Sequence, residues 1–108
     1  MYSNILAPTD GSDRAEAAIE EAADLAAVCD ARVHGLFVTD SGPLEHIDGK
    51  YPQAVSDIRR LGEEAVERVA AAGADRGVET TTAVMSGTVH RAIADYVDDN
   101  DIDAVVMA

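Results

Sequence analysis

The sequence predicts an α/β fold, with a doubly wound parallel sheet covered by helices on both faces. Four short apolar runs alternate with three segments whose apolar residues recur at helical spacing. Each helical segment is long enough to carry the chain from one parallel strand to the next. The 108 residues, 47% of them hydrophobic, contain no internal repeat and suit one domain with one modest core. We therefore expect a single domain over residues 1–108.

The first strand and the first helix have clear boundaries. An apolar run over residues 2–7 ends at Pro8 and is typical of a buried strand. The helix that follows can be capped by Ser12 or by Asp13, and Asp13 with Glu16 resembles a capping box. Its apolar stripe consists of Ala15, Ala18, Ile19, Ala22 and Ala26. This stripe predicts a helix that packs one face on the sheet.

The middle of the chain predicts a strand, a long loop and a second helix. Residues 32–38 form the second apolar run. Residues 39–52 contain glycine and proline without periodicity, which predicts a loop. Apolar residues then recur at helical spacing over residues 55–72, and Gly73 is expected to end this helix.

The last part of the chain repeats the alternation. Residues 79–84 are rich in threonine and valine, which favours a third strand. The pair Ser86-Gly87 predicts a turn, and Thr88 is the expected cap of a third helix. Ile102 and the residues from Ala104 to Ala108 form a fourth apolar run, expected to be the fourth strand. The whole order is therefore strand and helix in alternation.

The charge of the chain excludes several partners. Twenty-one acidic against eight basic residues give a net charge of −13, which repels the phosphates of nucleic acids and anionic lipids. We therefore expect neither a nucleic-acid nor a membrane partner. Lys50 is the only lysine, and aspartate outnumbers glutamate, a composition typical of a salt-adapted, acidic surface. We expect the melting temperature to fall when salt is removed, because self-repulsion is then no longer screened.

The cellular compartment is predicted from cysteine use and from the absence of a targeting segment. Cys29 is the only cysteine, so the chain has neither an internal disulfide nor a cysteine-based zinc site. The apolar runs are short, and the N-terminal residues lack the pattern of a signal peptide. These features predict a cytoplasmic protein.

The turn after the first strand carries the strongest candidate for chemistry. It spans Pro8 to Asp13 and matches neither the GxxxxGK[ST] nor the GxGxxG phosphate-binding pattern. The carboxylate of Asp10 could bind a ribose hydroxyl, a metal ion, or the first-turn amides of the helix. The residues alone leave these alternatives open. For Asp13, a capping role is a sufficient explanation.

Other polar residues give weaker indications. His34, His46 and His90 lack the spacing of a metal site, and each is interpreted as structural or solvated. No Ser-His-Asp order or pair of carboxylates indicates catalytic residues, so we assign none. The turn at 86–88 precedes a helix and could bind an anion, but turn geometry explains it equally well. The acidic run at 95–103 lacks the spacing and glycine of a calcium loop and is interpreted as surface.

Four segments, in this order along the chain, resemble the universal stress protein family. They are Ile5 to Ser12 at the start, Leu36 to Asp40 at the end of the second strand, Ser86-Gly87 followed by Ala92-Ile93, and Asp103 to Met107 in the fourth strand. The similarity runs the whole length of the chain. Their order, rather than any single motif, carries the resemblance.

The resemblance implies a Rossmann-like fold of the adenine nucleotide alpha hydrolase type, with strand order 3-2-1-4-5. In members that bind ATP, the nucleotide lies where the strand order reverses, between strands one and four. The first turn would meet the adenosine, the end of strand two the adenine, and the end of strand four the start of a phosphate loop. The nucleotide-binding residues implied in this way are Pro8, Thr9, Asp10, Val38, Met107 and Ala108.

The sequence departs from the family at its end. The glycine-rich phosphate loop would begin at or just after Ala108, and these residues are absent. We therefore expect strand order 3-2-1-4, with the fifth strand and last helix missing from a domain truncated at its C-terminus. Strand four would then be an uncovered apolar edge. The resemblance also implies a homodimer, which in this family commonly forms through strand five.

Three functions are weighed. The favoured one is a stress-response module that binds ATP or a related nucleotide and hydrolyses it slowly at most. A second is a family member that acts through dimerisation without nucleotide. The third is an adenylating ATP pyrophosphatase, for which residues 9–13 would have to replace a loop richer in glycine and serine. Because the chain is acidic, we expect Mg²⁺ to be required for polyphosphate binding, and only weak binding by residues 1–108 alone.

Overall fold

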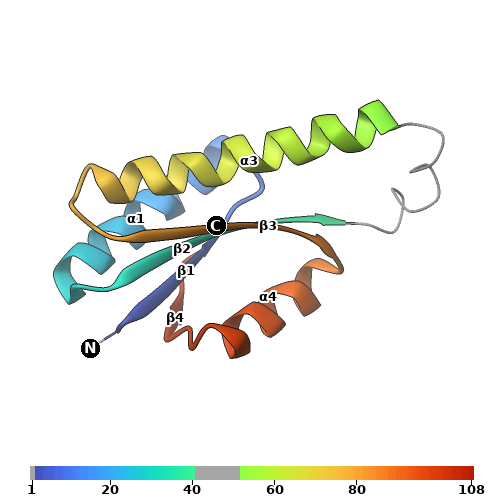
Figure 1. Ribbon diagram of the computed structural model, residues 1–108. Coiled ribbons are helices and arrows are strands. Elements are labelled where there is room, and N and C mark those ends of the chain that lie inside the picture. Colours follow the sequence, from blue (N-terminus) through green and yellow to red (C-terminus); the bar gives the residue numbers. More distant parts are fainter. Residues whose placement is uncertain (1, 41–51) are drawn as a thin grey trace.

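The computed structural model describes residues 2–40 and 52–108, which form a four-stranded parallel sheet with order β3-β2-β1-β4. The elements are β1 (Asn4–Pro8), α1 (Asp13–Cys29), β2 (Arg32–Asp40), α3 (Pro52–Ala74), β3 (Thr80–Gly87), α4 (Val89–Asp99) and β4 (Ala104–Val105). Figure 1 shows α1 and α3 on one face of the sheet and α4 on the other. The predicted fold class and strand order are confirmed.

The strand order reverses at β1. Ile5 of β1 pairs with Val33 of β2 on one side and with Ala104 of β4 on the other. The chain moves outward from β1 through β2 to β3, and then returns across the sheet to β4. The carboxyl ends of β1 and β4 therefore lie side by side, at the point where ligands bind in doubly wound sheets.

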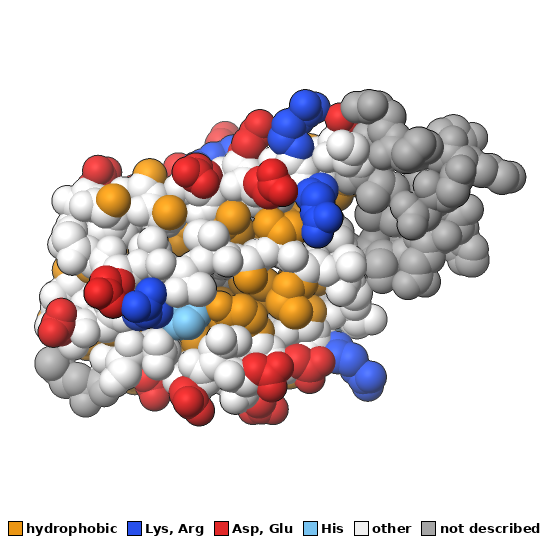
Figure 2. Space-filling model, viewed as in Figure 1, with side chains coloured by type: hydrophobic (Ala, Val, Ile, Leu, Met, Phe, Trp, Pro, Cys, Tyr) orange, Lys and Arg blue, Asp and Glu red, His pale blue; other side chains and the backbone are white. Residues whose placement is uncertain are grey.

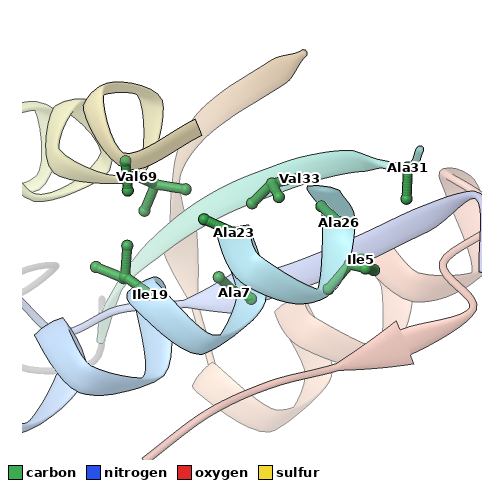
Figure 3. Close-up of a cluster of buried hydrophobic side chains, with 10 residues drawn as sticks. Ile5, Ala7, Ile19, Ala23, Ala26, Ala31, Val33 and Val69 are labelled. Carbon is green, nitrogen blue, oxygen red and sulfur yellow. The ribbon is translucent and has the colours of Figure 1, made fainter. Parts of the chain in front are cut away.

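The larger core lies between the sheet and the pair α1 and α3. Side chains alternate along a strand, so Ile5 and Ala7 of β1 and Val33 of β2 point to this face. Figure 3 shows them against side chains of α1 and α3. The buried members of this core are Ile5, Ala7, Ile19, Ala22, Ala23, Ala26, Ala31, Val33, Val69 and Ala72. The alanine stripe predicted from the sequence thus forms the contact surface of α1.

A smaller core lies on the α4 face. Leu6 of β1, Leu36 of β2 and Tyr96 of α4 are its buried members. Partly buried side chains surround them, namely Val38, Ala83, Ile93, Val97 and Ile102. One helix therefore covers this face, where two helices cover the other.

Several predicted boundaries were wrong at the strand ends. Of the loop predicted over 39–52, the first two residues extend β2 and Pro52 begins α3, while residues 41–51 lie outside the described part. β3 runs through the predicted turn to Gly87, because each of its eight residues pairs with β2. β4 is only two residues long. Pairing with a neighbouring strand, rather than local turn preference, decides these ends.

The alternatives for the cap of α1 are also resolved. Ser12 is the N-cap, and its hydroxyl oxygen accepts a hydrogen bond from the amide of Ala15 at 3.3 Å. Asp13 is therefore the first helical residue. At the other end, Asp30 adopts the left-handed conformation with φ 55°, as expected just beyond a helix.

Candidate functional site

A cavity of about 230 Å³ opens at the carboxyl ends of the strands, between the β1–α1 turn and the start of α4. Its walls come from β1 and the following turn, from β2, from α1 and α4, and from the residues after β4. The lining residues are Pro8, Thr9, Asp10, Ala15, Leu36, Val38, Val89, Ile93, Met107 and Ala108. Most of these side chains are apolar, and a few polar groups stand at one wall.

All six residues implied by the family resemblance line this cavity. The first three come from the end of β1 and its turn, the fourth from β2, and the last two follow β4. Asp10 and Met107 are 97 positions apart in sequence, yet they line one cavity. The structure thus brings these residues together in one lining.

Four lining residues were missed from the sequence as site residues: Ala15, Leu36, Val89 and Ile93. The helical stripe and the strand pattern identified them as core residues or as residues on a buried helix face. Their position at the cavity end of α1, β2 and α4 depends on how α4 lies on the sheet. A sequence signal for that docking is absent, because periodicity defines a face and not its position along the sheet.

The turn after β1 is fixed by local hydrogen bonds. The amide of Thr9 donates to the carbonyl oxygen of Leu36 at 2.9 Å, which ties the turn to β2. The hydroxyl oxygen of Thr9 accepts from the amide of Gly11 at 3.1 Å. A carboxylate oxygen of Asp10 accepts from the amide of Ser12 at 2.9 Å. These bonds hold the polar wall of the cavity in one conformation.

A contact from α3 also stabilises the turn after β1. The guanidinium of Arg68 donates to the carbonyl oxygen of Gly11 at 3.1 Å. Gly11 has φ +82°, and a Cβ built on it would lie 3.7 Å from that of Ala65, so α3 packs close to the turn. Elements from both sides of the turn therefore stabilise it.

The carboxylate of Asp10 is ionised under ordinary conditions. Hydrogen bonds from the side chain and then from the backbone of Ser12 lower its pKa below 3.8. Among the described residues that line the cavity, it is the only titratable side chain. A carboxylate with a low pKa is a good acceptor for hydroxyl groups but a poor general acid or base. The site therefore suits binding better than proton transfer.

The start of α4 borders the cavity through Val89. Thr88 is the N-cap, as predicted, but its side chain makes no capping hydrogen bond. The first-turn amides of a helix lack partners within the helix and favour anions. Among the described residues, no group of three or more His, Cys, Asp or Glu side chains could hold a metal ion.

The histidines lie apart from the cavity lining where they are described. His34 is buried below it, with 5% of its surface exposed, and is hydrogen-bonded to Tyr96 and Asn4. His90 is exposed on α4. His46 lies outside the described residues. The structural interpretation of His34 and the solvated interpretation of His90 both agree with these positions.

The chain is similar to known proteins in sequence and in structure. The model of the universal stress protein family matches residues 1–108. A curated relative, universal stress protein MJ0531 of Methanocaldococcus jannaschii, is 28% identical over 109 residues. That match covers 99% of this chain, and the chain spans 64% of the relative's length.

Solved structures share the fold. The hypothetical protein MJ0577 superposes with a TM-score of 0.84 at 22% identity, covering 99% of this chain and 74% of that protein. A member of the family from Burkholderia pseudomallei gives 0.80 at 26% identity, covering 96% and 79%. A universal stress protein in complex with cAMP gives 0.70 at 24% identity, covering 98% and 72%.

Proposed function

This chain belongs to the universal stress protein family, and we propose that its cavity binds the base and ribose of an adenine nucleotide. The observation that carries the proposal is the cavity at the strand-order reversal, where apolar side chains face the carboxylate of Asp10. The complex of a structural neighbour with cAMP supports the choice of an adenine nucleotide. The role is regulatory rather than strongly catalytic, since Asp10 suits binding better than proton transfer.

The size and chemistry of the cavity fit this part of the ligand. Its volume of about 230 Å³ is smaller than a pocket for a drug-sized molecule, typically about 300–1,000 Å³. The apolar side chains of Val38, Ile93 and Met107 can cover the faces of a purine ring. Asp10, held by its turn, can accept hydrogen bonds from ribose hydroxyls. Phosphates would extend out of the cavity.

The phosphates need compensation for the negative charge of the chain. With a net charge of −13, polyphosphate approaches against repulsion. The described residues hold no cluster of metal ligands, so Mg²⁺ would arrive on the phosphates themselves. The first-turn amides of α4 can favour the anion. We therefore expect ATP to bind with Mg²⁺ and residues 1–108 to bind nucleotides only weakly, roughly in the millimolar range, about 4 kcal/mol.

The test is an NMR titration of the ¹⁵N-labelled chain with adenosine, AMP, cAMP and ATP, the last with and without Mg²⁺. We expect shifts confined to residues around the cavity, with adenosine sufficient to produce them. Asp10→Asn keeps an oxygen for the amide of Ser12 but removes the charge, and should weaken adenosine binding about 10-fold or more. Asp13→Asn, on the exposed first turn of α1, is the matched control.

Two results would contradict the proposal. One is the absence of adenosine-dependent shifts around the cavity at concentrations of several times the expected dissociation constant. The other is an equal effect of Asp10→Asn and Asp13→Asn. Tight binding of ATP without metal would overturn the account of the phosphates, and formation of AMP and pyrophosphate would favour an adenylating enzyme.

We also propose that the protein acts in the cytoplasm as a homodimer, as the family resemblance implies. Among the described residues, no helix is long and apolar enough to cross a bilayer. Cys29, the only cysteine, suits a reducing compartment. Sedimentation equilibrium of a chain that includes the fifth strand measures the mass in solution, and a monomer at all concentrations would contradict the dimer.

A further inference from the structure

A chain of three polar side chains joins α4 to the sheet below the cavity. The hydroxyl of Tyr96 lies 2.7 Å from Nδ1 of His34, and Oδ1 of Asn4 lies 3.0 Å from Nε2 of the same ring. The rings of His34 and Tyr96 meet edge to face with centroids 5.6 Å apart. The side-chain nitrogen Nδ2 of Asn4 in turn donates to the carbonyl oxygen of Asp101 at 3.5 Å. Side chains of α4, β2 and β1 thus meet at one buried histidine.

The partners determine which nitrogen of His34 carries the proton. Oδ1 of Asn4 can only accept, so Nε2 of His34 must be the donor. In the neutral ring Nδ1 then accepts, and the hydroxyl of Tyr96 donates to it. In the neutral tautomer, both ring nitrogens of His34 therefore have a matching hydrogen-bond partner. The arrangement is therefore complementary to neutral His34.

Protonation of His34 reverses one of these bonds. Nδ1 becomes a donor, so the hydroxyl of Tyr96 has to accept and its own proton loses the acceptor that it had. Burial, and then the positive charge of Arg32, already lower the pKa of His34 below 6.5. Burial also raises the pKa of Tyr96. A charge on the ring is thus unfavourable while α4 is docked.

Among the described residues around His34, no carboxylate is hydrogen-bonded to the ring. On β2, the guanidinium of Arg32 bonds to Glu79 at 2.7 Å and to the hydroxyl of Thr81 on β3 at 2.9 Å. The carboxylate of Asp103, after α4, accepts hydrogen bonds from the amides of Ser3 and Asn4 at the start of β1. Both carboxylates already have partners. Neither is bonded to the imidazole, and the charge that acts on the ring is the positive one of Arg32, which is second to burial in lowering the pKa of His34.

α4 is the helix that such a charge can displace. Its buried residues are Ala92 and Tyr96, whereas α1 buries six. Local opening occurs first in elements with few buried apolar contacts. Ile93, three residues before Tyr96 on the same helix face, lines the cavity. Movement of α4 at Tyr96 therefore also moves a wall of the cavity.

We propose that protonation of His34 releases α4 from the sheet and opens the wall of the cavity formed by Val89 and Ile93. The shape of the cavity would then depend on pH. A single proton taken up on opening raises the opening equilibrium of α4 by up to about tenfold per pH unit below about pH 6.5. The link to ligand affinity rests on the proposed nucleotide binding, whereas the release of α4 does not.

The experiment is hydrogen exchange of backbone amides between about pH 8 and about pH 5, corrected for the intrinsic pH dependence of exchange. We expect the opening equilibrium of α4 to rise steeply below about pH 6.5, while that of α1 changes much less. The ¹⁵N shifts of His34 in the unmodified protein report its tautomer, expected to be protonated at Nε2. This measurement needs no variant.

Variants separate the histidine from general acid effects. His34→Gln keeps a donor towards Asn4 but does not titrate, so the pH dependence of α4 exchange should vanish. Tyr96→Phe removes the donor to Nδ1, so neutral His34 loses part of its advantage in the docked state and the pH dependence of α4 exchange should become weaker. His90→Gln is the matched control, an exposed histidine on α4 whose replacement should leave the profile unchanged.

Exchange of α4 that does not change with pH, or that changes equally in His34→Gln, would overturn the proposal. A ring protonated at Nδ1 in the neutral state would overturn it as well. Titration with adenosine at both ends of the pH range adds the functional part, and we expect weaker binding at about pH 5. If adenosine never binds, the proposed function fails, but the exchange profile of α4 still decides the present proposal.

Discussion

The two faces of the sheet are built differently. The face under α1 and α3 is filled by alanine, valine and isoleucine, with ten of the described residues buried in its core. The face under α4 has three buried core residues, a polar chain through His34, and the cavity. Figure 2 shows apolar side chains exposed between α3 and α4, with acidic side chains along the α4 rim.

The contrast between the two faces assigns stability mainly to the α1 and α3 face, and the proposed binding site to the α4 face. Close packing of small apolar side chains gives α1 and α3 a fixed position. α4 is held by only two buried residues, Ala92 and Tyr96, and the hydroxyl of Tyr96 is polar, so its position responds to conditions. The cavity lies on this second face, where a wall can move. The three predictions that follow test this contrast.

The largest expected effect on stability comes from shortening one isoleucine on each face of the sheet in turn. Ile19 on α1 is 2% exposed within the larger core, and Ile19→Ala should lower the free energy of unfolding by about 3–4 kcal/mol. Ile93→Ala on α4, where the isoleucine is only partly buried and borders the cavity, should cost about 1–2 kcal/mol. Urea denaturation measures both. Equal losses would remove the contrast between the faces.

Close packing under α3 predicts a smaller loss from an added methyl group. A Cβ on Gly35 would lie 2.8 Å from the Cβ of Val69, so Gly35→Ala should cost about 1–3 kcal/mol. In the double variant with Val69→Ala, the coupling between the two sites should offset part of that cost. Additive losses at Gly35 and Val69 would show that the two residues do not compete for space.

Salt is expected to have the smallest effect and to act mainly on the α4 side. That segment and the turn after it carry one arginine, Arg91, against five aspartates: Asp95, Asp98, Asp99, Asp101 and Asp103. In about 1 M salt the Debye length is about 3 Å and their repulsion is screened. Transfer to about 10 mM salt should lower stability by about 1 kcal/mol, or about 4–8 °C in melting temperature. A melting temperature that does not fall would show that the acidic surface is not salt-adapted.

Much of the cavity could be predicted from the sequence because local signals mark it. Pro8 and the turn beyond it end a strand, and the order of motifs along the chain resembles one family with a known strand order. That order places Asp10 beside Met107, and the structure has both in one cavity lining. Leu36 and Ile93 were missed as site residues, because their place there depends on the position of α4 along the sheet.

The importance of His34 could not be predicted either. In the sequence it is a polar residue within an apolar run, and both a structural and a solvated interpretation were open. Its partners Asn4 and Tyr96 lie 30 and 62 positions away. No local pattern connects residues so far apart, and only the packing of α4 on the sheet brings them into hydrogen-bonding distance.

The sequence by itself determined the alternation of strands and helices, the apolar stripe of α1 and the net charge of −13, because these depend on the periodicity and charge of the residues along the chain. Tertiary structure decided where β2 and β3 end, which residues line the cavity and how His34 is bonded. These depend on contacts between elements far apart in the chain, and such contacts exist only once the sheet has formed and α4 has docked on it.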